Sequence, residues 1–213
     1  MICKKSIKKS LLAGVLISIG ALFSIAAKPY GNVVQGLCFS VGLFGVLSCG
    51  ALLFTGQVLS IRGVWDGKIS VKDLLVRWVG VWAFNLVGSV CVAAMAYVVH
   101  FDASQTAQLK AAMPWHELVI RAILCNVLVC MAVWMKRNCL LSEDALASLV
   151  SATLPVACFV ACGFEHSVAD MLYMPLGMMH GAVGLVDCMR VILLATVGNV
   201  LGGIAFSWMV YEK

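Results

Sequence analysis

Residues 159–170 have the sequence FVACGFEHSVAD, and this stretch decides the fold class of the chain. It lies within a long apolar segment, yet it contains Glu165, His166 and Asp170. An ionisable residue at membrane depth is costly and usually faces a pathway or cavity rather than lipid. Gly163 beside Glu165 and His166 also indicates an interrupted helix, which a membrane tolerates only where the backbone is buried in protein or lines a cavity. The stretch therefore predicts a substrate or proton pathway on a broken span.

The composition of the 213-residue chain is that of a membrane protein. Hydrophobic residues make up 62% of it and charged residues 12%, whereas a soluble domain has about 25% charged residues. The formal net charge of +5 does not indicate nucleic-acid binding, because the basic residues lie in short loops. The ten cysteines include no C-x-x-C pair, and we expect neither a metal site nor a cofactor.

Six apolar segments are long enough to cross a membrane as helices of roughly 20 residues. Strands of a β-barrel would need alternating polarity, which these segments lack. The second and the fifth segments exceed one straight span of about 30 Å, so each could be two half-helices joined by a loop. The six segments are about Leu11–Ala27, Val33–Ile61, Leu74–Val99, Leu118–Met135, Ala145–Met179 and Val191–Tyr211.

Two short sequence patterns recur about half the chain apart. Cys49-Gly50 in the second segment reappears as Cys162-Gly163 in the fifth, 113 positions later. Asn85–Gly88 (NLVG) in the third segment corresponds to Asn199–Gly202 (NVLG) in the sixth, 114 positions later. Because each half would contain three spans, the two halves would insert with opposite orientations, as in transporters built from inverted repeats.

We therefore predict a single transmembrane domain over residues 1–213. Its first repeat would cover about 11–99 and its second about 115–211. One alternative is that the first segment is a cleaved signal peptide, since it has a lysine-rich start and alanines near its end. That alternative would leave five spans and no such symmetry. Two stretches rich in small residues, Gly42–Gly45 and Gly198–Gly203, are expected to let helices of neighbouring subunits approach closely.

The distribution of Lys and Arg predicts that both termini face the cytoplasm. With this orientation eleven basic residues lie inside and four outside, in agreement with the positive-inside rule. The inside residues are Lys4, Lys5, Lys8, Lys9, Arg62, Lys68, Lys72, Arg77, Lys136, Arg137 and Lys213. The outside residues are Lys28, Lys110, Arg121 and Arg190.

Three motifs resemble those of the formate/nitrite transporter family, which also includes hydrosulfide channels. They are Leu53–Gly56 (LFTG), Ile123–Asn126 (ILCN) with Val129–Trp134 (VCMAVW), and Gly163–Ser167 (GFEHS). Their order and spacing agree with the family, and the likeness extends from the first span to the sixth. The resemblance implies an all-α, aquaporin-like protomer of six transmembrane helices, with the second and fifth broken. It also implies a homopentamer in a prokaryotic inner membrane, in which each protomer carries small monovalent anions or their conjugate acids.

The resemblance assigns ten residues to the transport pathway. Four are polar: they match the family's central pore histidine, the threonine of the loop that breaks the second span, an asparagine facing the pore, and an outer lysine. In that order they are His166, Thr55, Asn126 and Lys110. The other six match an outer apolar constriction, at Phe39 and Phe159, and an inner one, at Leu43, Leu53, Phe54 and Val129.

Asp170 departs from the family, which usually has asparagine at this position. It would lie one helical turn after His166, on the same helix face. A charged Asp170 close to the pathway would repel anions. Alternatively it caps a backbone group, or it pairs with Arg190 outside the pore. Of these we favour a structural role.

The polar residues suit the passage of a weak acid. A small anion cannot cross an apolar constriction bare, because removing its water is costly, whereas the conjugate acid is neutral. We expect Lys110 to concentrate the anion, Thr55 and Asn126 to donate hydrogen bonds, and His166 to exchange protons. The alternative for each of these residues is a role in packing, in bridging helices or in satisfying a broken helix end.

Two other classes of protein fit less well. An intramembrane enzyme would need a nucleophile–base pair or a set of metal ligands, and Glu165 with His166 supplies neither. A non-transporting assembly or sensor protein would not require polar residues on both broken helices. We therefore expect no enzymatic activity.

Overall fold

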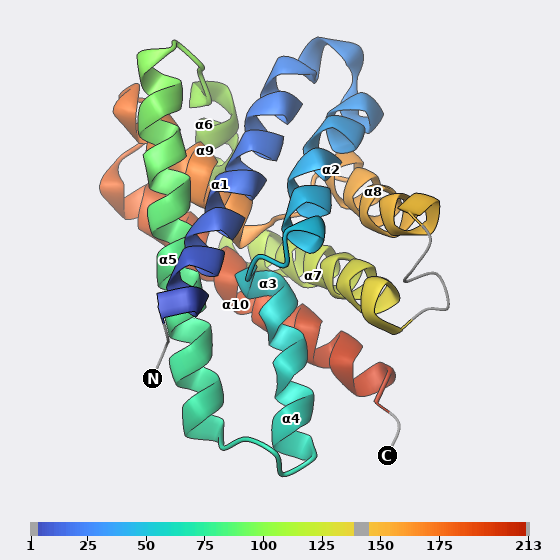
Figure 1. The fold of residues 1–213 in the computed structure, drawn as a ribbon. Coiled ribbons are helices and arrows are strands. Elements are labelled where there is room, and N and C mark those ends of the chain that lie inside the picture. Colours follow the sequence, from blue (N-terminus) through green and yellow to red (C-terminus); the bar gives the residue numbers. More distant parts are fainter. Residues whose placement is uncertain (1–3, 139–144, 212–213) are drawn as a thin grey trace.

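The computed structural model describes residues 4–138 and 145–211, which fold as a bundle of helices (Figure 1). Four of the described helices are long and apolar enough to cross a membrane. They are α1 (Lys4–Ala26), α5 (Val71–Val98), α7 (Trp115–Asn138) and α10 (Leu185–Met209). They contain most of the first, third, fourth and sixth predicted segments. Lys213, which the charge distribution places inside, lies outside the described residues, as does the side chain of Arg137.

The second and fifth predicted segments each contain more than one helix. The second holds α2 (Asn32–Ser48), α3 (Phe54–Gln57) and the 3₁₀ turn η2 (Val58–Ile61), and it is followed by α4 (Arg62–Trp65). The fifth holds α8 (Ala145–Ala161) and α9 (Ser167–Met179). Two further elements were not predicted, the 3₁₀ turn η1 (Lys28–Tyr30) and the nine-residue helix α6 (Ser104–Ala112).

A left-handed glycine ends both α2 and α8. Gly50 has φ +59° and Gly163 has φ +67°, a region that residues with a Cβ rarely adopt. In both turns the glycine N–H donates to the carbonyl three residues earlier, and the next N–H donates to the carbonyl five residues earlier at 2.9 Å. This pattern is the Schellman motif. It satisfies carbonyls at the end of the helix while the chain leaves the helix axis.

The bundle is apolar outside and partly polar inside. Large apolar side chains such as Val79 on α5 and Leu193 on α10 are exposed. In contrast, three asparagines are fully buried, namely Asn85, Asn126 and Asn199. A soluble monomer rarely exposes so much apolar surface, whereas lipid tails are as apolar as leucine. The distribution of side chains is therefore that of a protein surrounded by lipid.

Glycines allow close helix contacts within the chain. A Cβ on Gly88 of α5 would lie 2.4 Å from the carbonyl oxygen of Leu11 on α1, and one on Gly202 of α10 would lie 2.2 Å from that of Ile123 on α7. The prediction that Gly42–Gly45 and Gly198–Gly203 pack against a neighbouring subunit is wrong. The two glycines of the first stretch pack against α1 of the same chain. The three of the second are buried against α7 and η2 of the same chain, where only a hydrogen atom fits.

Candidate functional site

Asn85 of α5 holds the loop that follows α2. Its Oδ1 accepts a hydrogen bond from the backbone N–H of Phe54 at 2.8 Å. Its Nδ2 donates to the carbonyl oxygen of Leu52 at 3.0 Å and to that of Ser10 on α1 at 2.7 Å. One buried side chain thus satisfies backbone groups on both sides of the start of α3, and it ties this loop to α1.

Asn199 of α10 holds the loop that follows α8 in the same way. Its Oδ1 accepts from the N–H of Ser167 at 2.9 Å, and its Nδ2 donates to the carbonyl oxygens of Glu165 at 2.9 Å and Ala122 at 2.8 Å. The sequence analysis noted Asn85 and Asn199 only as marks of a repeat and missed this role. The available signal was an asparagine inside an apolar span, because a buried amide needs hydrogen-bond partners.

His166 is the last residue of the second loop, and its two ring nitrogens have different partners. Nδ1 accepts a hydrogen bond from the backbone N–H of Ala169 at 3.1 Å, so the side chain caps the start of α9. Nε2 lies 3.0 Å from the hydroxyl oxygen of Thr55. Because Nδ1 is an acceptor, the neutral ring carries its hydrogen on Nε2 and donates it towards Thr55. The predicted pair of polar residues is therefore in direct contact, and the helix cap sets the tautomer.

Two phenylalanines cover the imidazole of His166. The ring of Phe159 stacks on it with centroids 5.8 Å apart and planes inclined by 17°. The ring of Phe39 approaches edge-on at 6.5 Å, and the two phenylalanines contact each other at 5.6 Å. The residues assigned to the outer apolar constriction therefore come together directly beside the histidine.

Lys110 of α6 forms ion pairs with two carboxyl groups. Its Nζ contacts Glu165, and it lies 2.9 Å from an oxygen of Asp170 on α9. The side chains are 12%, 4% and 0% exposed for Lys110, Glu165 and Asp170. Asp170 does not pair with Arg190, whose guanidinium donates to backbone carbonyls of residues 111 and 113. The positive charge expected at Lys110 is therefore compensated within the chain by contacts with two carboxyl groups.

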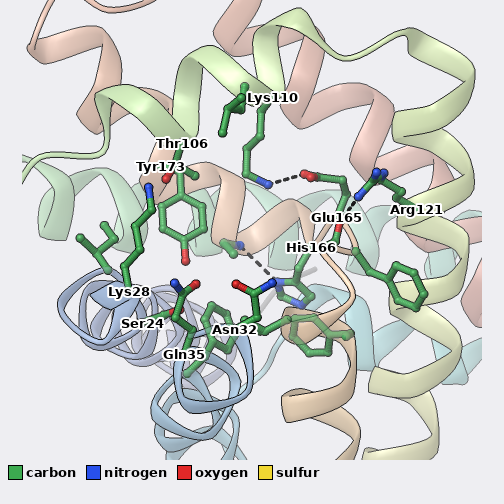
Figure 2. Close-up of a pocket in the computed structure, with 18 of the residues that line it drawn as sticks. Ser24, Lys28, Asn32, Gln35, Thr106, Lys110, Arg121, Glu165, His166 and Tyr173 are labelled. Carbon is green, nitrogen blue, oxygen red and sulfur yellow. Dashed lines mark hydrogen bonds and ion pairs between the residues drawn. The ribbon is translucent and has the colours of Figure 1, made fainter. Parts of the chain in front are cut away.

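A pocket of about 540 Å³ leads to His166 (Figure 2). The ends of α1 and α2, helix α6, helix α9 and the loop before it form its wall. Polar side chains face each other across it, with Lys28, Asn32 and Gln35 on one side and Lys110, Glu165 and Arg121 on the other. The hydroxyl group of Tyr173 points into the space between them.

The cations of this pocket differ in how their charge is matched. Arg121 pairs with Glu117 at 2.7 Å and also donates to the carbonyl oxygen of Gly163 at 2.9 Å. Lys28 donates to the neutral side chain of Gln105 on α6. Within the described part of the chain, Lys28 is the pocket cation that forms no ion pair. An anion in the pocket would therefore meet an uncompensated positive charge at Lys28 rather than at Lys110.

Asn126 of α7 bridges helices and does not line this pocket. Its Nδ2 donates to the carbonyl oxygens of Asn199 at 2.5 Å and Thr55 at 3.3 Å. Its Oδ1 is buried without a hydrogen-bond partner among the described residues. The four residues assigned to the inner constriction are also absent from the pocket wall and lie in the apolar core; they are Leu43, Leu53, Phe54 and Val129.

A family model described as Formate/nitrite transporter matches residues 2–212. The chain belongs to the formate/nitrite transporter family. It is 34% identical over 248 aligned residues to a probable formate transporter of Methanothermobacter thermautotrophicus, with 98% of this chain and 89% of that protein covered. It is 36% identical over 191 residues to the formate channel FocA of Escherichia coli strain K12, with 81% and 66% covered.

Solved structures of the formate/nitrite transporter family share this fold. An FNT family ion channel superimposes with a TM-score of 0.87 at 28% identity, covering 98% of this chain and 90% of the other. A pentameric formate channel with formate bound gives a TM-score of 0.81 at 27% identity, covering 98% and 97%. The resemblance stated from the motifs and the all-helical fold class are thus confirmed.

The chain is therefore an integral membrane protein from a family of channels and transporters. The relatives are named as transporters and channels rather than enzymes, which fits the expectation of no enzymatic activity. Within residues 4–138 and 145–211, no three His, Cys, Asp or Glu side chains are grouped so that they could hold a metal ion.

Proposed function

We propose that the protein is a channel or transporter for small monovalent anions, such as formate, nitrite or hydrosulfide, and for their conjugate acids. The observation that carries this proposal is the contact between His166 and Thr55 at the end of a polar pocket, covered by Phe39 and Phe159. Because the two rings contact each other and the imidazole, we expect a solute to lose its water before it reaches the histidine. The polar pair then replaces part of the water that the solute loses.

The proposed path begins where Lys28 attracts the anion into the pocket. The Nε2–H of His166 and the hydroxyl of Thr55 offer donors that hold the anion, which gains its proton there from a water molecule that the ring polarises, while the neutral ring keeps its own Nε2 hydrogen. The resulting neutral acid crosses the apolar inner residues without the cost of a desolvated charge. The unpartnered Oδ1 of Asn126 is available to accept a hydrogen bond from that acid.

We infer that the single transmembrane domain consists of two inverted three-helix repeats. In support, the bonds of Asn85 recur at Asn199, and the partners Ser10, Leu52 and Phe54 recur as Ala122, Glu165 and Ser167, each 112 or 113 positions later. The turns before these loops are both Schellman motifs. On this interpretation α2–α3 and α8–α9 are the broken second and fifth spans of an aquaporin-like protomer.

We further infer a homopentamer with one pathway in each protomer, in a prokaryotic inner membrane and with both termini cytoplasmic. The similar structure of a pentameric formate channel supports the assembly. The apolar outer surface can contact both lipid and neighbouring subunits. Because all of the pathway residues belong to one chain, the shared axis of the oligomer has no part in the path. The excess of Lys and Arg in the inside loops supports the orientation.

Flux into proteoliposomes tests the proposal. Formate, nitrite, hydrosulfide, lactate and acetate would be compared at two pH values, with protein-free liposomes as the control. We expect at least one anion to exchange faster than in the control, with flux rising as the external pH falls. If every anion equilibrates at the control rate, transport is refuted, and a non-transporting assembly or sensor protein becomes the better assignment.

Mixed oligomers test the number of pathways. Wild-type subunits would be assembled with His166→Asn subunits in known ratios. If each protomer conducts alone, flux falls in proportion to the fraction of variant subunits. A collapse caused by one variant subunit per oligomer would instead place the pathway on the shared axis.

A further inference from the structure

The cluster formed by Lys110, Glu165 and Asp170 has one positive group and two acidic groups. Both carboxyl groups contact the same Nζ, and all three side chains are largely buried. If every group were ionised, the cluster would carry a net charge of −1. The contact between Lys110 and Asp170 is an ion pair at 2.9 Å, and neither oxygen of Asp170 has a hydrogen bond of good geometry with the residues that the structure describes. A fully buried carboxylate with so few partners is poorly compensated.

The groups around the cluster do not supply a second positive charge. On α9, His166 is held neutral by its role as a helix cap, and the phenol ring of Tyr173 lies 5.6 Å from the Nζ of Lys110. The thiols of Cys125 on α7 and Cys188 on α10 interact electrostatically with Asp170 and carry no positive charge. Among the described residues, no other Lys, Arg or His forms an ion pair with either carboxyl group. Within the described part of the chain, the excess negative charge therefore has no cationic partner.

We propose that Glu165 and Asp170 together bind one exchangeable proton, and that this proton controls the access of anions to His166. With the proton bound, the cluster is neutral and an anion can approach the imidazole. When the proton leaves, the cluster carries −1 beside the pathway and repels the anion. Since Glu165 and Lys110 line the pocket while Asp170 lies behind them, the proton exchanges with pocket water through Glu165. The control of flux rests on the proposed function, whereas the bound proton does not.

Infrared spectroscopy of the purified full-length oligomer tests the proton directly. Glu165 and Asp170 are the buried carboxyl groups among the described residues, so a protonated carboxyl band near neutral pH can be assigned with variants. The band should be present in the wild type and absent in both Asp170→Asn and Glu165→Gln, because each variant leaves one carboxylate for one lysine. It should persist in Lys110→Met, because removal of the cation favours the protonated form of the two carboxyl groups. Absence of the band from the wild type, or its persistence in both single-carboxyl variants, would overturn the proposal.

A matched control is available at the mouth of the same pocket. Asp102 lines the pocket and is exposed, and hydrogen bonds from Ser104 lower the pKa of this carboxyl below its usual range. It is therefore ionised near neutral pH. Asp102→Asn also removes one negative charge, and the asparagine side chain can still accept the hydrogen bond from Ser104. The infrared band should be unchanged in this variant, and its loss would mean that the band does not report the cluster.

The functional consequence appears in the pH profile of anion exchange, with equal pH on both sides of the membrane. At pH values above the one at which the cluster loses its proton, the ratio of wild-type flux to Asp170→Asn flux should fall about tenfold per pH unit, as expected for the loss of a single proton. Each curve is scaled to its own value at low pH, and Asp102→Asn should follow the wild type. Parallel curves for wild type and Asp170→Asn would refute control by the cluster. If the wild type moved no anion at all, the proposed function would fail, while the infrared result would still decide whether the proton is bound.

Discussion

The two loops that follow α2 and α8 have the same backbone and different chemistry. Each begins with a left-handed glycine, each is held by one asparagine, and each leads into a short helix. The first loop, residues 49–53, is uncharged and delivers Thr55 to the site. The second, residues 162–166, contains Glu165 and His166. The contacts that hold the backbone are thus duplicated, whereas the titratable groups of the site belong to the second loop and its partners.

This difference shows that the membrane constrains the backbone of the two loops more than their side chains. A backbone that leaves a helix at membrane depth must have its polar groups satisfied, and both loops meet this need with a buried asparagine. Once the backbone groups have hydrogen-bond partners, the side chains of the loop can take part in binding and proton transfer. The two loops meet at the hydrogen bond between Thr55 and His166, so each contributes one partner to the same contact.

The largest expected effect on flux comes from removing the imidazole of the second loop while keeping a cap at the start of α9. In His166→Asn, the asparagine can still cap α9, because it is a favourable residue at helix starts. We expect anion flux to fall by about 100-fold or more, as on losing a proton-exchanging group, with the oligomer intact by gel filtration. Unchanged pH-dependent flux in this variant would exclude a role for His166 in proton exchange.

A second prediction breaks the backbone contacts of each loop in turn. Asn199→Leu and Asn85→Leu each leave two backbone groups of a loop without partners, at a cost of about 1–3 kcal/mol per group. Both variants should therefore lose several kcal/mol of stability, measured by thermal unfolding in detergent. If one variant were as stable as the wild type, the two asparagines would not be equivalent clamps.

A third prediction addresses the contact between the loops. Thr55→Val keeps the shape of the side chain and removes its hydroxyl, so the Nε2–H of His166 loses its partner. The loss of one hydrogen bond of about 1.4 kcal/mol corresponds to a roughly tenfold fall in flux. Thr55→Ser, which restores a hydroxyl, should recover most of the flux. Equal flux in the valine and serine variants would show that the methyl group matters and the hydroxyl does not.

The smallest expected effect compares the two glycines. Alanine at Gly50 or Gly163 must adopt positive φ, which costs about 1–2 kcal/mol. A Cβ at Gly163 would also lie 3.0 Å from the Nη1 of Arg121, whereas one at Gly50 would meet only the end of Lys9 at 3.5 Å. Thermal unfolding should therefore show Gly163→Ala to be the more destabilising. The reverse order would indicate that Arg121 moves aside at no cost.

The sequence predicted much of the fold because hydropathy and helix interruption are local properties. The apolar segments indicated helices of membrane length, and Gly163 beside Glu165 and His166 indicated the end of α8. Helix α6 was not predicted, because its polar and alanine-rich residues lack an apolar stripe of the kind that marks a helix. Its importance comes from placing Lys110 against Glu165 and Asp170, a contact that no local pattern could reveal.

The site was predicted less completely because its electrostatics depend on distant partners. The motifs identified His166 and Thr55, which are 111 positions apart and hydrogen-bonded in the structure. They also assigned a free positive charge to Lys110, whose partner Glu165 is 55 positions away. Sequence reasoning considered Arg190 as a partner for Asp170, although Lys110 takes that place. A list of charges along the chain does not say which of them neutralise each other.

The sequence by itself determined the membrane class, the family and the position of the imidazole, because these follow from apolar length and from local residue patterns. Only the tertiary structure decided the tautomer of His166, the role of the buried asparagines and the charge balance around Asp170. Each of these depends on atoms brought within about 3 Å of one another from separate helices, and a hydrogen bond or ion pair loses its strength steeply beyond such distances.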